Sequence, residues 1–211
     1  MKKPIQLSLF KKTPRYFGGL YLHGKRRSRR PLSSKDAIHL VMRSSWAKGP
    51  FSFLLLKHKK TISAIIHSQA KKYRVRIYEL SIVGNHLHFV LKIPDRDSYK
   101  SFIRVVSGQI ASQVMGSRSF AEFHKRLRGD APSHPGFKEI QGLEQAFWQF
   151  RPFSRVLHWG RDFKTCCAYV KQNTAEAMGF VKYKPRQQKD PFAHWCALIF
   201  ADDDEVKCAA Q

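Results

Sequence analysis

Two histidines, His86 and His88, stand one residue apart in the stretch SIVGNHLHFVLKIP, which covers residues 81–94. Its apolar, β-branched and aromatic residues predict a strand, in which residues two apart project from the same face. Leu87 and Phe89 then face the core, and both imidazoles leave from the opposite side. Two imidazoles placed in this way can bind one metal ion through bonds of about 2 Å, or can simply pack beside each other. The strand alone leaves both interpretations open.

The composition of the chain favours a nucleic-acid partner. Its 211 residues include 39 Lys and Arg against 15 Asp and Glu, which gives a formal net charge of +24. A net charge of magnitude about 2 to 8 is usually enough to keep a small domain soluble. The additional positive charge therefore indicates a polyanionic partner. We expect no membrane partner, because the sequence has neither a run of about 18 apolar residues nor a basic amphipathic helix with a broad apolar face.

The cysteines suggest a reducing compartment. Cys166, Cys167, Cys196 and Cys208 show no C-x-x-C spacing. They therefore suit neither a zinc site nor a disulfide framework, and we expect free thiols. We predict a cytoplasmic location, and the family resemblance described below implies association with the nucleoid of a bacterium.

The rest of the sequence must supply the elements that position the two histidines. Strand-like and helix-like segments follow one another in the order β-α-β-β-α-β-α. The two strands joined by the short Gly84-Asn85 turn are antiparallel neighbours. The pattern therefore predicts an α+β fold, with a ferredoxin-like antiparallel sheet and helices packed mainly on one face. The expected strands are 36–46, 73–84, 86–93 and 146–159, and the expected helices are 58–73, 95–116 and 161–180.

We divide the chain into three parts. Residues 1–34 form a basic N-terminal arm, since residues 1–31 contain ten Lys or Arg and no acid. Residues 35–182 form the globular domain, with an irregular excursion at 117–142, and residues 183–211 form a C-terminal tail. A charge run is usually a solvated tail, but this arm has the sign of the whole molecule and suits binding to a nucleic-acid backbone.

Several fragments resemble one known family in their order and spacing. GNHLHFVLKIP resembles the His-hydrophobic-His signature of the HUH endonucleases, and of their transposases in particular. FWQFRPFSRVL, followed by AYVKQN and AMGFV, resembles the Trp-strand and the Tyr-helix of the REP-associated tyrosine transposases. These belong to the single-tyrosine, IS200-like transposase superfamily, and the resemblance covers residues 36–182. It implies that residues 35–182 are an HUH single-tyrosine transposase domain with a ferredoxin-like sheet.

The resemblance implies roles for four residues. His86, His88 and Asn173 would be ligands of a divalent cation, and Tyr169 would be the nucleophile that forms a covalent 5′-phosphotyrosine and frees a 3′-OH. Mg²⁺ or Mn²⁺ suits a set of two imidazoles and an amide. Residues four apart are neighbours on a helix, so Tyr169 and Asn173 share a side. Their angular distance from the apolar stripe places both at the rim of the packed face.

The implied substrate is single-stranded or hairpin DNA, which the protein would cleave and rejoin. Four aromatic residues are candidates for stacking on bases, or else belong to the core: Trp46, Trp148, Phe150 and Trp159. The candidate DNA-binding basic residues are Arg26, Arg27, Arg29, Arg30, Lys92, Arg151, Arg155 and Lys171.

Two alternatives stay open at this point. A catalytically inactive nucleic-acid-binding module derived from such a transposase would carry the same charge. It would have no need of the complete set His86, His88, Tyr169 and Asn173. A homodimer is also compatible with the sequence, because in this superfamily the tyrosine helix can serve the His pair of a partner subunit.

Overall fold

The described residues of the computed structural model, 16–19, 29–116 and 146–182, form a five-stranded antiparallel sheet. The strand order is β1-β5-β2-β4-β3, and β2 pairs with β4 on one side and β5 on the other. The strands are β1 (Tyr16–Phe17), β2 (Ala37–Arg43), β3 (Arg76–Ile82), β4 (His86–Lys92) and β5 (Phe153–Leu157). Several predictions lie outside the described residues: most of the basic arm, with Arg26 and Arg27, the excursion at 117–142, and the tail at 183–211, with Cys196 and Cys208.

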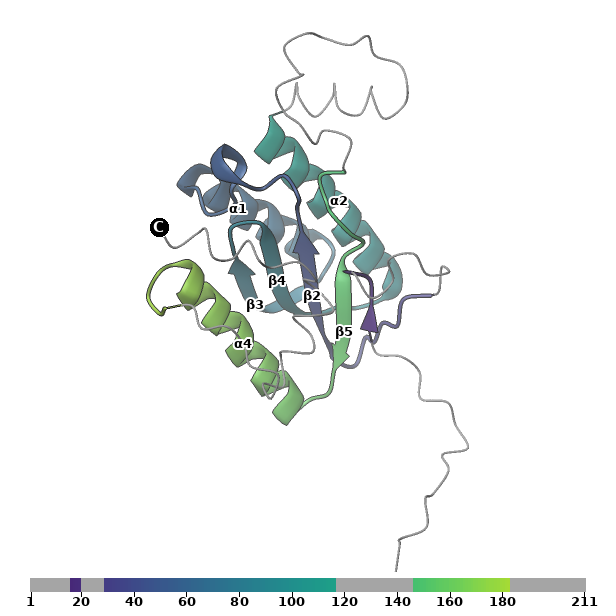
Figure 1. Cartoon of the computed structure of the whole chain (residues 1–211). Coiled ribbons are helices and arrows are strands. Elements are labelled where there is room, and N and C mark those ends of the chain that lie inside the picture. Colours follow the sequence, from purple (N-terminus) through teal and green to yellow (C-terminus); the bar gives the residue numbers. More distant parts are fainter. Residues whose placement is uncertain (1–15, 20–28, 117–145, 183–211) are drawn as a thin grey trace, which may run out of the picture.

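Helices cover both faces of the sheet. α1 (Leu56–Lys72) and α2 (Arg96–Met115) pack together on one face, and α4 (Arg161–Ala177) lies on the opposite face (Figure 1). The alternation of β4 explains both layers, since Leu87 and Phe89 join the large core under α1 and α2, whereas Val90 joins a small cluster under α4. The predicted α+β fold, with an antiparallel sheet and helices mainly on one face, is confirmed.

The last predicted strand is much shorter than expected. The segment predicted as strand over 146–159 is extended in the sheet only as β5, and residues before it form a loop with a single bridge between Ser44 and Trp148. Pro152 has no N–H to give to a strand ladder, so regular pairing begins after it. Phe147 and Trp148 instead pack against the large core. The aromatic residues that led to the prediction of a strand in this segment are part of the core packing.

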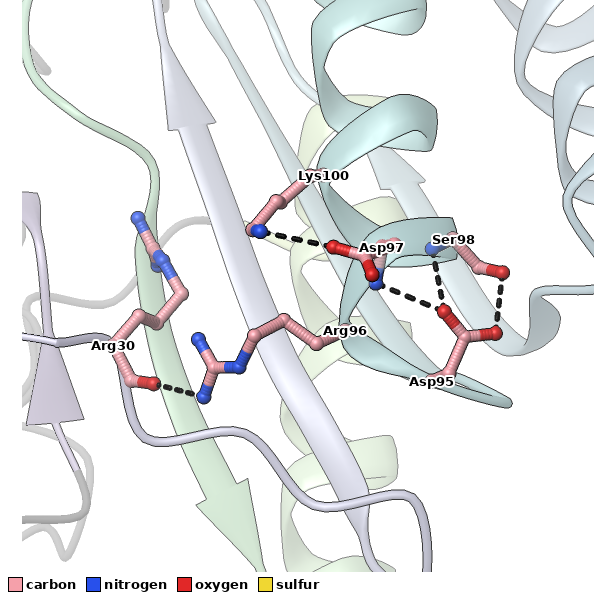
Figure 2. Close-up of polar contacts among 6 residues, drawn as sticks. All are labelled: Arg30, Asp95, Arg96, Asp97, Ser98 and Lys100. Carbon is pink, nitrogen blue, oxygen red and sulfur yellow. Dashed lines mark hydrogen bonds and ion pairs between the residues drawn. The ribbon is translucent and has the colours of Figure 1, made fainter.

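The start of α2 holds the chain that leads into β2 (Figure 2). The Asp95 carboxylate accepts hydrogen bonds from the backbone N–H groups of Asp97 and Ser98, at 2.9 and 2.8 Å. This cap satisfies two of the amides that have no partner inside the helix. Arg96 then donates from Nη2 to the backbone carbonyl of Arg30, at 2.8 Å. The end of the predicted basic arm is therefore attached to the domain.

The edge strand β1 also lies within the predicted arm, and it depends on a glycine. Gly18 has a φ of +83°, and the next amide, of Gly19, donates to the carbonyl of Arg151 at 2.8 Å. A Cβ added at Gly18 would lie 2.1 Å from the carbonyl oxygen of Pro152. Only glycine allows the chain to turn this close to the loop before β5.

Gly18→Ala is expected to detach β1 from β5 without unfolding the rest of the sheet. The added methyl group meets backbone that cannot move aside, and a positive φ itself costs about 1 kcal/mol for a residue with a Cβ. Hydrogen exchange of the Gly19 amide should lose its protection. Gly116→Ala is the matched control, because Gly116 has a φ of +79° but no described atom within 4 Å of an added Cβ. Equal exchange at Gly19 in both variants would contradict the prediction.

Candidate active site

His86 and His88 lie at the start of β4, on the face that α4 covers. The rings meet edge to face, with centroids 4.8 Å apart and planes at 81°. His88 is fully buried, and His86, the first residue of the strand, is half-buried. The alternation of the strand placed both imidazoles on one face, as the sequence predicted, and the structure brings them into contact.

Asn85 determines which ring nitrogen of His86 carries the proton. Its side-chain oxygen lies 2.8 Å from Nδ1 of His86, and an amide oxygen only accepts, so the proton of the imidazole is on Nδ1. Burial, followed by the nearby His88 and Arg43, lowers the pKa of His86 well below its usual value. The ring is therefore neutral, and Nε2 keeps its lone pair. This is the form in which histidine binds a metal ion.

Tyr169 faces the histidines from α4. Its ring lies edge-on to that of His88, with centroids 5.5 Å apart and planes at 89°. Only 3% of the residue is exposed, so the predicted position at the rim of the helix face is wrong for Tyr169. The sheet under this helix carries imidazoles rather than only aliphatic side chains, and a tyrosine packs against them inside the interface.

Asn173 follows Tyr169 by one helical turn, on the same side of α4. It is half-buried, at the edge of the interface as predicted, and its side-chain nitrogen is buried. Within the described ranges no group of three His, Cys, Asp or Glu could hold a metal ion, so a cation on the His pair needs a further ligand of another type. The amide oxygen of Asn173 supplies that type. Two imidazoles and an amide fit Mn²⁺ or Mg²⁺ in chemistry.

His39, for which no role was predicted from the sequence, lies beside this group. It lies on β2, is fully buried and stacks on His88, with ring centroids 5.6 Å apart and planes 7° apart. His39 Nε2 is 3.3 Å from His88 Nδ1. Alternation along the strand predicts that His39 faces the other side of the sheet from Ile38 and Leu40. Only the pairing of β2 with β4 shows that this is the face on which His88 lies.

Arg155 was predicted to contact DNA, but the structure places it inside. It is 6% exposed, and its guanidinium forms an ion pair with Asp162 in the first turn of α4. Asp162 also accepts a hydrogen bond from the His158 backbone N–H, at 3.1 Å. The pair joins β5 to α4 and so holds the helix that carries Tyr169. A buried, ion-paired side chain does not reach a phosphate, so we correct the prediction for Arg155.

The other predicted DNA contacts differ in their surroundings. Arg29 and Arg151 are exposed, whereas Arg30 is half-buried. Arg30 donates to the Ser154 hydroxyl at 2.6 Å, and its guanidinium lies 4.2 Å from the centroid of the Phe17 ring. This side chain joins the segment before β2 to β5 and β1.

Lys92 and Lys171 lie along the same side of the sheet as the histidines. Lys92 Nζ is 5.7 Å from the ring centroid of Trp159, which is 45% exposed. Lys171 is exposed and forms an ion pair with Glu79 at 3.1 Å. Among the predicted stacking residues, Trp46 and Trp148 pack against the large core, and Phe150 is half-buried. Trp159 is the most exposed of the four candidates.

Comparison with known proteins gives the class of this protein. The family described as "Transposase IS200 like" matches residues 34–140, about half of the chain. The match includes His86 and His88 and ends before Tyr169. The chain belongs to the IS200-like transposase family, whose members are DNA-processing enzymes, and the resemblance seen in the sequence is confirmed.

Solved structures of transposases are also similar. A REP-associated tyrosine transposase bound to a REP hairpin has 15% identity and a TM-score of 0.46, over 74% of this chain and 76% of that one. A chain from Deinococcus radiodurans R1, described as a transposase, has 12% identity and a TM-score of 0.36, over 70% of this chain and 97% of that one. No curated protein matches. No helix in the described part of the chain is long and apolar enough to span a membrane.

Proposed function

We propose that this protein cleaves and rejoins single-stranded or hairpin DNA through a covalent 5′-phosphotyrosine on Tyr169. The observation that carries the proposal is the contact between the Tyr169 ring and His88, the fully buried member of the pair of histidines on one sheet face. Family membership supports a transposase, and the charge of +24 supports a polyanionic substrate. The proposed site is assembled from one chain, and assembly across a homodimer stays an alternative to it.

In the proposed reaction the Tyr169 oxygen attacks the scissile phosphorus as the hydroxyl loses its proton. The bond between phosphorus and the 3′-oxygen breaks, and that oxygen takes up a proton and leaves as a free 3′-OH. The phosphotyrosine conserves the energy of the broken ester, so attack by a 3′-OH reverses the step and rejoins DNA. A divalent cation held by His86, His88 and Asn173 would stabilise the charge that develops on the phosphoryl oxygens.

The burial of Tyr169 sets a condition on substrate binding. Because 3% of the residue is exposed, a phosphate can reach the hydroxyl only if DNA opens the contact between α4 and β4. The smaller of the two cores, which includes Val90, Cys166 and Val170, lies between α4 and the sheet. A small interface of this kind is suited to opening at low cost.

Lys92 and Trp159 provide a place for the DNA strand next to the site. Lys92 follows His88 by four residues on the same face of β4, about 13 Å along the strand. The exposed Trp159 ring beside it offers a surface for a base, and the ammonium group suits a phosphate. Arg29, Arg151 and Lys171 are the further exposed cations that we include among the proposed contacts.

The decisive experiment is incubation with labelled hairpin DNA that carries single-stranded flanks, in the presence of Mn²⁺ or Mg²⁺. We expect a protein–DNA adduct that survives denaturation with detergent, together with a released fragment ending in 3′-OH. EDTA should prevent both products. Tight binding of the hairpin without any adduct would instead support the alternative, an inactive nucleic-acid-binding module.

A further inference from the structure

His39 lies in the middle of β2, under α4, and the proposed reaction gives it no role. Its ring is fully buried and stacks on that of His88. It also meets the Tyr169 ring edge-on, with 6.0 Å between the two ring centroids. A polar group is costly to bury unless it makes hydrogen bonds, and an aliphatic residue would fill the same space more cheaply. The contact with His88 suggests what the imidazole does.

The hydrogen bond between His39 Nε2 and His88 Nδ1 contains one proton and can run in two directions. If His39 donates, the proton of neutral His88 is on Nε2, and that nitrogen has no lone pair for a cation. If His88 donates from Nδ1, its Nε2 keeps the lone pair. Metal binding through Nε2 of His88 therefore requires His39 to be the acceptor.

Two features of His39 allow it to accept. Its Nε2 lies 3.3 Å from Nδ1 of His88, and an imidazole with a single ring proton has one bare nitrogen that accepts a hydrogen bond. Its other nitrogen, Nδ1, is buried and has no hydrogen-bond partner among the residues described. No third group there imposes a tautomer on the ring. His39 can therefore adopt the tautomer that His88 needs.

We propose that His39 is a positioning residue, which accepts a hydrogen bond from Nδ1–H of His88 and so presents Nε2 of His88 to a divalent cation. Asn85 has the equivalent relation to His86, because its oxygen accepts from Nδ1–H of that ring. Both proposed ligands are thus held through Nδ1 by a neighbour. Partners of this kind orient a ligating histidine and fix its tautomer. This inference rests on the metal site of the proposed function.

The first test measures Mn²⁺ binding to the DNA-free protein by calorimetry. His39→Leu, which removes the acceptor, should weaken binding by about 10- to 100-fold. His39→Gln can still accept through its side-chain oxygen and should stay within a few-fold of wild type. His67→Gln, a substitution on the exposed side of α1, is the control and should leave binding unchanged. Wild-type affinity in His39→Leu, or equal losses in the Leu and Gln variants, would overturn the proposal.

The second test reads the tautomer itself, by ¹⁵N-resolved NMR of the histidine side chains in wild-type protein saturated with Mg²⁺. We expect His88 to carry its proton on Nδ1, and a proton on Nε2 would overturn the inference. Mn²⁺ binding with the expected tautomer, but without any DNA adduct, would support the role of His39 while it refuted the proposed reaction. A wild-type protein that bound neither cation would refute the metal site and this inference together.

Discussion

Tyr169→Phe should abolish the covalent DNA adduct while the protein keeps its fold and its affinity for hairpin DNA. Phenylalanine lacks the oxygen that would attack phosphorus, and loss of a nucleophile typically reduces turnover by about 10³-fold or more. The phenyl ring retains the edge-on contacts with His88 and His39, which lie 5.5 and 6.0 Å away between centroids. Stability should therefore change by no more than one hydrogen bond, about 1 kcal/mol. Gel analysis of the adduct and of binding on the same samples separates the two effects.

Tyr99→Phe is the matched control for this substitution. Tyr99 is also buried, but it belongs to α2 and to the large core on the opposite face of the sheet. Removal of its hydroxyl should leave adduct formation at the wild-type rate. An adduct that persists in Tyr169→Phe would show that another residue is the nucleophile.

Asp162→Ala should destabilise the DNA-free protein by about 3 kcal/mol, because it removes the carboxylate that pairs with the buried guanidinium of Arg155. Arg155 is 6% exposed, and its guanidinium forms an ion pair with Asp162. The variant should also loosen the start of α4, since Asp162 accepts from the His158 backbone. Urea unfolding measures the first effect, and hydrogen exchange in α4 measures the second.

Two further variants define the origin of this loss. Arg155→Met combined with Asp162→Ala should recover most of the stability, because no buried charge remains. Asp97→Ala breaks the pair with Lys100 on α2, which has a comparable geometry at 2.9 Å but exposed side chains (Figure 2). That substitution should cost about 1 kcal/mol or less. Equal losses for Asp97→Ala and Asp162→Ala would contradict the assignment of a buried, structural pair.

The properties that depend on neighbouring residues in the chain could be predicted from the sequence. The alternation of β4 determined that His86 and His88 share a face, because successive side chains of a strand point in opposite directions. Helical spacing likewise put Tyr169 and Asn173 on one side of α4. The β-α-β-β-α-β-α order led to the α+β fold, since these local patterns each require a partner surface of a defined kind.

Only the tertiary structure decided which residues meet across elements. His39 contacts His88 because β2 is the neighbour of β4, 49 positions away in the sequence, and no local period contains that pairing. Arg155 was predicted to be a surface cation. In the structure β5 pairs with β2, and α4 packs nearby and supplies Asp162 to the Arg155 guanidinium, so the side chain is buried. Tyr169 is buried because α4 packs its ring against His88 on the sheet. Side-chain burial is a property of two packed surfaces, and the sequence of one surface describes only half of it.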